Sequence, residues 1–309
     1  MIKIKKQVLP AALAVLTVML MTAAAELSGE KEILFPEIAA IAAGALIAPK
    51  FAWKTSKLRL FVLICIGSVI GLLISMFVPF SVSIKLCIAF LAASLLFQCS
   101  GTTFAPVISS VVLPVMLGTS SVVYPIAAAA LTLLILMERV LIEKLGIVEK
   151  TEFTPESMPD KRAFAELFAR WLIGSIVIAA AVGTGFKFAA APPLLVAFTE
   201  FCRKGSAVQK KPAAITFMIV GCALVGTLFR YIFTLFGGKM FIAAGLTMLF
   251  VCIIMKSAKL FVPPAAALSV LAFLIPDEAV VTYPLQIAVG TVIFVIAGIV
   301  FGKVSEKAD

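Results

Sequence analysis

Histidine is absent from this chain of 309 residues, and its six cysteines form no CxxC pair. The cysteines lie singly within apolar stretches or at their ends. Structural zinc, haem and iron–sulfur sites need histidine or closely spaced cysteine ligands, so the sequence excludes these sites. We therefore expect no metal site and no cofactor.

Common enzyme motifs are missing as well. The chain has no GxSxG nucleophile elbow and no nucleotide-binding P-loop. Its acidic residues cluster in predicted loops and form no membrane-depth pair suited to acid–base catalysis. The sequence thus argues against an enzyme and against a transporter that drives itself with ATP.

Charged residues make up only 14% of the chain, whereas hydrophobic residues make up 62%. Apolar runs repeatedly reach the roughly 20 residues of a membrane-spanning helix, which predicts an all-α polytopic membrane protein. The net charge of +10 follows from basic residues sorted to one membrane side, so we expect no nucleic-acid partner. The first run resembles a secretory signal, but the residues after Ala25 make a weak cleavage site, and we expect a retained helix.

Twelve apolar segments separated by helix breakers are predicted, six in each half. They lie near residues 8–25, 35–49, 59–79, 82–98, 104–117 and 121–141, and then near 165–186, 190–202, 213–235, 239–256, 261–275 and 280–302. The predicted domains are a first membrane repeat (1–142), a charged cytoplasmic linker (143–163) and a second membrane repeat (164–309).

The two halves carry the same markers in the same order. The marker pairs are Gly71 and Gly226, Pro106 and Pro263, and Tyr124 and Tyr283, which are 155, 157 and 159 positions apart. This regularity indicates a tandem duplication. Six segments in each half bring both repeats into the membrane in the same direction, which predicts a pseudo-twofold axis along the membrane normal.

The basic residues predict the orientation. With the amino terminus in the cytoplasm, 21 of the 26 lysines and arginines fall on the cytoplasmic side, as the positive-inside rule requires. The exceptions are Lys31, Lys85, Lys187, Arg230 and Lys239. We therefore predict a multi-pass protein of the inner (plasma) membrane with both termini in the cytoplasm.

Four segments, the second and fifth of each half, are short. Their 13 to 15 residues cover about 20–23 Å, which is less than the roughly 30 Å hydrocarbon core. Irregular backbone at membrane depth survives only inside protein or along a wet cavity. The short segments are therefore where we expect the substrate.

Candidate residues lie around the fifth segments and, for Thr199, in the second segment of the second half. The candidate substrate-binding residues are Ser100, Thr102, Thr103, Pro106, Ser109 and Ser110 in the first half, and Thr199, Pro263, Pro264 and Ser269 in the second. Hydroxyls and free amides at a proline-headed helix start can bind an anion. Helix capping and close helix packing are the alternative interpretation of the same residues.

Three charged residues lie in apolar surroundings and are candidates for coupling or charge recognition. Glu37 either carries a proton or cation, or simply caps a helix amino terminus. Glu200 either titrates in the pathway or pairs with nearby basic residues. Arg230 either attracts an anion or extends to the lipid headgroups.

The second half combines residues 206–211 (SAVQKK), a helix with Gly221 and Gly226, residues 262–265 (VPPA) and Tyr283 before Pro284. With these motifs, residues 191–303 resemble the HPP family of integral membrane proteins. The first half resembles it more loosely, and the family's name-giving histidine is replaced by Val262 and by Ala105. The resemblance implies two fused HPP-like units. Because some family members are associated with nitrite transport in plastids and cyanobacteria, it favours a small anion.

The leading interpretation is a secondary transporter or channel for a small inorganic or organic anion. A neutral metabolite or a proton-coupled cation is the nearest alternative, and a non-transporting membrane subunit or sensor is another. The expected partners are a small-molecule solute and the lipid bilayer, with a homodimer as a further possibility.

Overall fold

The computed structural model describes residues 2–150, 153, 155, 159–203 and 205–307. Within this part of the chain all regular structure is helical, and no strand occurs. Eight helices are long and apolar enough to cross a membrane. They are α1 (Ile2–Ser28), α3 (Lys57–Phe77), α4 (Val82–Cys99), α6 (Val123–Lys144), α7 (Lys161–Gly183), α10 (Pro212–Leu235), α11 (Met240–Ala258) and α14 (Tyr283–Lys307). The all-α prediction is confirmed, and such helices are typical of a membrane-embedded protein.

Four further helices are short. They are α2 (Glu37–Ala42), which continues as the π-helical turn η2 (Ala43–Ile47), α5 (Val107–Leu117), α8 (Pro192–Phe201) and α12 (Pro263–Leu271). Helices of 9 to 11 residues cover only about 14–17 Å, roughly half of a hydrocarbon core. The remaining elements are η1 (Lys31–Ile33), η3 (Lys187–Ala190), α9 (Ala207–Lys210) and α13 (Asp277–Val280).

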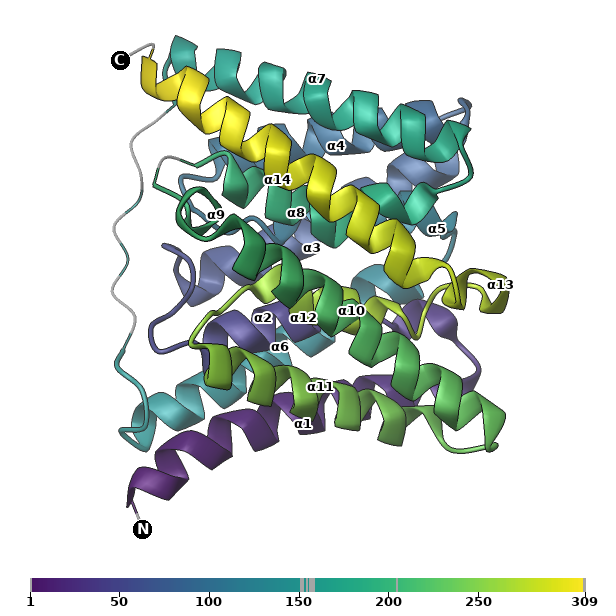
Figure 1. The fold of residues 1–309 in the computed structure, drawn as a ribbon. Coiled ribbons are helices and arrows are strands. Elements are labelled where there is room, and N and C mark those ends of the chain that lie inside the picture. The colour runs from purple at the N-terminus through teal and green to yellow at the C-terminus, as the bar shows by residue number, and fades with distance from the viewer. Residues whose placement is uncertain (1, 151–152, 154, 156–158, 204, 308–309) are drawn as a thin grey trace.

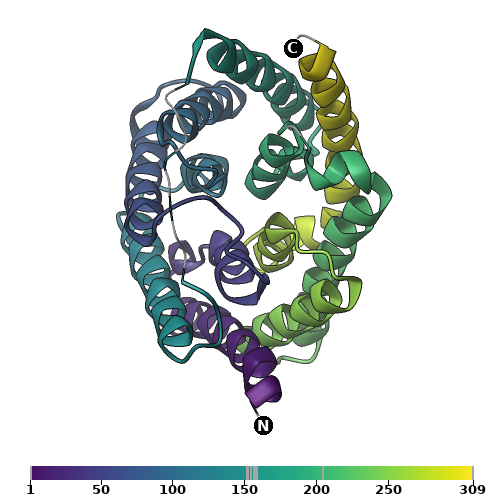
Figure 2. The same cartoon turned by 90° about the vertical axis from the view of Figure 1, so that its left-hand side faces the viewer.

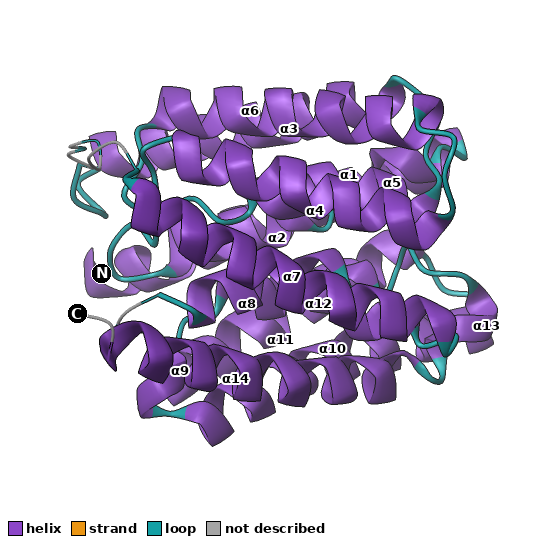
Figure 3. Ribbon diagram, turned by 90° about the horizontal axis from the view of Figure 1, so that it is seen from above, coloured by secondary structure: helices purple, strands orange, loops and turns teal. Residues whose placement is uncertain are grey.

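The long helices surround the short ones. Figure 2 shows the long helices as a ring with the short helices inside it, and Figure 3 shows the loops gathered at the two ends of the bundle. Inside the ring, α5 packs on α8, α8 on α12, and α12 on α2. Every residue of α2, η2 and α12 is buried. The outer faces of the ring instead expose large apolar side chains such as Ile176 and Phe217, as a lipid-facing surface does.

Both described ends of the chain lie at one end of the bundle (Figure 1). An even number of membrane crossings places them so. The described residues between α6 and α7 lie at this same end. The segment between these two helices contains most of the predicted linker, of which residues 151–152, 154 and 156–158 lie outside the described part. The predicted cytoplasmic side corresponds to this end, which we call the terminal end.

A tyrosine near the start of the last helix of each half binds the short helix before it. The Tyr124 hydroxyl donates to the Ser110 carbonyl of α5 at 3.0 Å. The Tyr283 hydroxyl donates to the Leu268 carbonyl of α12 at 2.7 Å. Each tyrosine also meets a phenylalanine edge to face, Phe35 at 5.9 Å in the first half and Phe188 at 5.7 Å in the second. The same aromatic contact therefore occurs twice.

A glycine in α3 and another in α10 allow the short helices to approach closely. A Cβ atom added at Gly71 would lie 2.3 Å from the Val111 carbonyl oxygen of α5. One added at Gly226 would lie 1.9 Å from the Ser269 carbonyl oxygen of α12. No side chain fits at either position, so glycine is required where the outer and inner helices cross.

Candidate substrate pathway

The most deeply placed acidic group belongs to Glu37, the first residue of α2. Its side chain is 1% exposed. The Ser109 hydroxyl of α5 donates a hydrogen bond to its Oε1 atom, whereas its Oε2 atom has no partner. The structure thus brings together Glu37 and Ser109, two of the candidate residues, from two different short helices.

Two tyrosines, one from each half, lie within electrostatic range of the same carboxyl group. They are Tyr124 and Tyr283, and the carboxyl group is that of Glu37. Their hydroxyls donate to the carbonyls of Ser110 and Leu268. The two tyrosines are therefore polar neighbours of Glu37 but bring no positive charge to it. We call Glu37, Ser109 and the two tyrosines the central polar group.

Other predicted hydroxyls are used within their own helices. Ser110 donates to the Val107 carbonyl at 2.8 Å, Ser269 to the Ala266 carbonyl at 2.7 Å and Thr199 to the Leu195 carbonyl at 3.0 Å. Hydrogen bonds of this local kind satisfy a buried hydroxyl without any ligand. For these three residues the contacts fit the packing alternative better than a binding role.

Three adjoining cavities of about 370, 310 and 670 Å³ open at the terminal end. Arg203 lines all three, and we call their combined space the basic vestibule. The basic residues that line it are Lys50, Lys54, Arg139, Lys150, Arg170 and Arg203, and the acidic ones are Glu149, Glu166 and Glu200. The candidate residues Thr102, Thr103 and Pro263 also line it, so the vestibule reaches the start of α12.

The loop before α5 forms one wall of this vestibule. The Thr103 hydroxyl accepts a hydrogen bond from the Lys54 amide at 2.8 Å. The Ser100 hydroxyl donates to the Phe97 carbonyl at 2.7 Å and lies 2.8 Å from the Thr102 hydroxyl, so it caps the end of α4. Pro106 directly precedes α5.

Prolines also open the second pair of short helices. Pro263 and Pro264 are the first two residues of α12, and α8 likewise begins with Pro192 and Pro193. Proline has no amide hydrogen, which leaves nothing unsatisfied in a first helical turn. These residues therefore explain where the helices start, whatever else they do.

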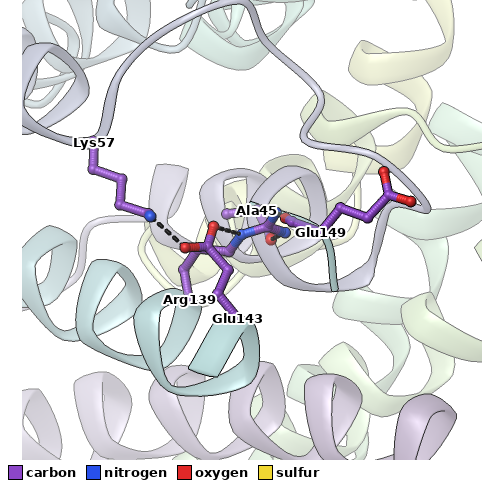
Figure 4. Close-up of polar contacts among 5 residues, drawn as sticks. All are labelled: Ala45, Lys57, Arg139, Glu143 and Glu149. Atoms are coloured by element: carbon purple, nitrogen blue, oxygen red, sulfur yellow. Dashed lines mark hydrogen bonds and ion pairs between the residues drawn. The ribbon is translucent and has the colours of Figure 1, made fainter. Parts of the chain in front are cut away.

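Arg139 holds the end of the short helix α2–η2 to the vestibule wall. Its guanidinium donates to the Ala45 and Glu149 carbonyls, each at 2.7 Å, and to the Glu143 carboxylate at 2.8 Å. Lys57 binds the second oxygen of Glu143. Figure 4 shows these contacts, with the Glu149 carboxylate turned away from Arg139. In the sequence, Arg139 is one of the predicted cytoplasmic charges and carries no other signal.

Trp53 lies between the vestibule and the short helices. Its indole nitrogen donates to the Glu200 carboxylate at 3.3 Å, and its ring meets Phe104 edge to face at 5.1 Å. A Cβ atom added at Gly44 would lie 2.3 Å from this ring, so the indole rests directly on the backbone of η2. Trp53 was missed in the sequence, although it is one of only two tryptophans.

Arg230 does not face the vestibule. It is buried, and its guanidinium donates to the Ala272 and Ile275 carbonyls after the end of α12 and to the Asp277 carboxylate at 2.5 Å. These contacts stabilise a helix carboxyl end, where a cation is favourable. The two interpretations made from the sequence, an anion site and contact with headgroups, stay predictions.

No protein-family model, no curated protein and no solved structure matches this chain significantly. The resemblance to the HPP family therefore stays a prediction from the sequence motifs.

Proposed function

We propose that this protein is a secondary transporter of a small anion, embedded in the inner (plasma) membrane with the vestibule open to the cytoplasm. The observation that carries the proposal is the vestibule of basic residues, which ends at short buried helices inside a ring of membrane-length helices. Helices that stop partway through the membrane, with a wet cavity beside them, are a frequent basis of solute sites.

The charge of the vestibule favours an anion. Among the described residues, six basic side chains and three acidic ones line the space. A concave site with one prevailing charge raises the local concentration of oppositely charged solutes, most strongly where the walls have a low dielectric constant. The start of α12 at Pro263, with its helix dipole, adds to the attraction.

The proposed architecture is two repeats of six segments. Each repeat begins and ends with a long helix, α1 and α6 in the first and α7 and α14 in the second. The recurring tyrosine–carbonyl and glycine–carbonyl contacts support this duplication. Under this proposal, the four short helices belong to corresponding positions of the repeats, and the substrate passes between them. Two fused HPP-like units are the family assignment we propose on the sequence motifs.

The test is flux of nitrite, nitrate, formate and small carboxylates into liposomes that contain the purified protein. We expect saturable uptake of at least one of these anions. Arg203→Gln should lower uptake severalfold at low anion concentration, because Arg203 lines every part of the vestibule. Lys239→Gln is the control, since Lys239 lies beside Glu26 at the opposite end of the bundle. Equal uptake in both variants would remove the vestibule from the pathway. Solute flux that does not change when one anion is replaced by another would favour a neutral solute.

A further inference from the structure

We propose that Glu37 is the proton-binding site of this transporter, so that anion and proton cross the membrane together. The inference rests on the proposed transport function and adds its coupling ion. It distinguishes Glu37 from the other acidic residues by position, because Glu37 alone belongs to the central polar group.

The contacts of Glu37 leave its negative charge unbalanced. One carboxyl oxygen accepts a hydrogen bond from Ser109 and the other has no partner. Among the described residues no lysine or arginine forms an ion pair with it. A buried carboxylate without a counter-charge is costly inside a membrane. A proton bound to the unpartnered oxygen Oε2 neutralises the carboxyl group and removes that cost.

The groups on the neighbouring elements do not supply a cation either. The helix α2 packs against α12, α6, α1 and η2, and neither α12 nor η2 contains a charged residue. From α6, Tyr124 lies within electrostatic range of Glu37 and is uncharged while its hydroxyl donates to Ser110, whereas Glu138 accepts a hydrogen bond from Thr17. Glu26 of α1 is bound to the Phe241 amide.

The basic groups of α6 lie at the far end of the short helix. Arg139 contacts Ala45, eight residues beyond Glu37 and about 12 Å along the helix axis. Arg139 is also bound to Glu143, and Lys144 is the last residue of α6. Tyr283 of α14 completes the surroundings, and it is neutral when its hydroxyl donates to Leu268.

This position gives the proton a defined effect on the anion. When Glu37 is charged, it repels an anion that enters between the short helices from the vestibule. When a proton is bound, the repulsion disappears and the anion can occupy the central polar group. Proton and anion binding therefore favour each other, which is the thermodynamic requirement for symport.

The experiment measures nitrite, nitrate, formate and carboxylate uptake together with proton uptake, in liposomes with an acidic exterior. We expect the wild type to accumulate one anion and take up protons with it. Glu37→Gln should lose the proton uptake that accompanies the anion and at least about tenfold in proton-driven accumulation, since its side chain cannot bind and release a proton.

Glu138→Gln is a matched control. Glu138 is also buried, also has one threonine or serine donor and also has an unpartnered Oε2 atom, but it lies between the ring helices α1 and α6. It should retain proton-driven accumulation. Retention by Glu37→Gln, or equal loss in both variants, would overturn the assignment.

Two further outcomes separate this inference from the transport proposal. Anion uptake by the wild type without any proton movement overturns the coupling alone. No uptake of any anion by folded wild-type protein overturns the transport function itself. If Glu37→Gln does not fold, infrared spectra of the wild type decide the matter. A protonated-carboxyl band that changes when the anion is added supports the proposal, and an unchanged band contradicts it.

Discussion

The two halves of the molecule share their packing but differ in their polar groups. In both, a tyrosine hydroxyl donates to a carbonyl of the short helix in the fifth segment, α5 or α12, and a glycine meets that helix at a carbonyl oxygen. The residue before the tyrosine-bound carbonyl is Ser109 in the first half and Ala267 in the second. The tyrosines contact Phe35 in the first half and Phe188 in the second. The residue two positions later is Glu37 in the first half and Ala190 in the second.

This difference separates scaffold from candidate chemistry. The shared contacts involve backbone carbonyls and can be satisfied in either half without a ligand. Among the described residues of the short helices, the Glu37–Ser109 pair occurs once, and only there does a fully buried carboxyl oxygen remain without a hydrogen-bond partner. We infer that the second half supports the pathway while the first half supplies the group that titrates.

The ends of α5 and α12 show a second difference. After α5 the chain turns at Gly118, which has a left-handed φ of 69°, and the Thr119 amide bonds the Pro114 carbonyl at 2.9 Å. After α12 the carbonyls of Ala272 and Ile275 are bound by Arg230 instead. A glycine turn and a buried arginine are thus alternative ways to complete a helix carboxyl end.

The largest expected effect comes from breaking the shared glycine contacts. Gly71→Ala and Gly226→Ala should each destabilise the protein by about 3 kcal/mol or more, because the added Cβ atom meets a backbone oxygen that cannot move away. Thermal unfolding in detergent measures the effect. Gly221→Ala, on the same helix as Gly226 but with open space around it, should stabilise by about 0.5–1 kcal/mol. Equal behaviour of the two α10 variants would refute the close approach.

A smaller loss is expected from the contact that only the second half has. Arg230→Met should cost about 1–3 kcal/mol, because two carbonyls lose their partner in a buried place. Anion uptake per folded molecule should not change. Asp277→Asn is the comparison, with almost no loss of stability, since Asp277 is 83% exposed. Reduced uptake by stable Arg230→Met protein would return this residue to the pathway.

The smallest effect tests whether the tyrosine contacts are equivalent. Tyr124→Phe and Tyr283→Phe should each cost about 1 kcal/mol, the typical net value of one hydrogen bond. Similar shifts of the unfolding temperature would support the duplication. A shift in one variant only would mean that the two contacts are not equivalent.

Periodicity and breakers in the sequence were sufficient for much of the fold. The all-α class follows from apolar runs, and the short helices α8 and α12 follow from the prolines that start them. These signals are local, so one sequence contains them. Glu37 and Ser109, which the structure pairs, were already candidates in the sequence, because polar residues inside apolar runs stand out.

The remaining contacts depend on elements distant in the sequence. Trp53 and Glu200 are 147 positions apart, and Arg139 and Ala45 are 94 apart. No periodicity relates such residues, so the sequence did not predict these contacts, and it gave Trp53 and Arg139 no role in the site. Arg230 was given two interpretations by its apolar context, but its acceptors at the end of α12 appear only once the helices are packed.

The most direct test of the account compares the two halves by anion uptake in liposomes. Ser109→Ala removes the hydroxyl bound to Glu37, and Ala267→Ser places a hydroxyl at the corresponding position of the second half. We predict saturable anion uptake by the wild type, a severalfold loss in Ser109→Ala at equal amounts of folded protein, and unchanged uptake in Ala267→Ser. Wild-type uptake that Ser109→Ala leaves intact would contradict a pathway through the short helices.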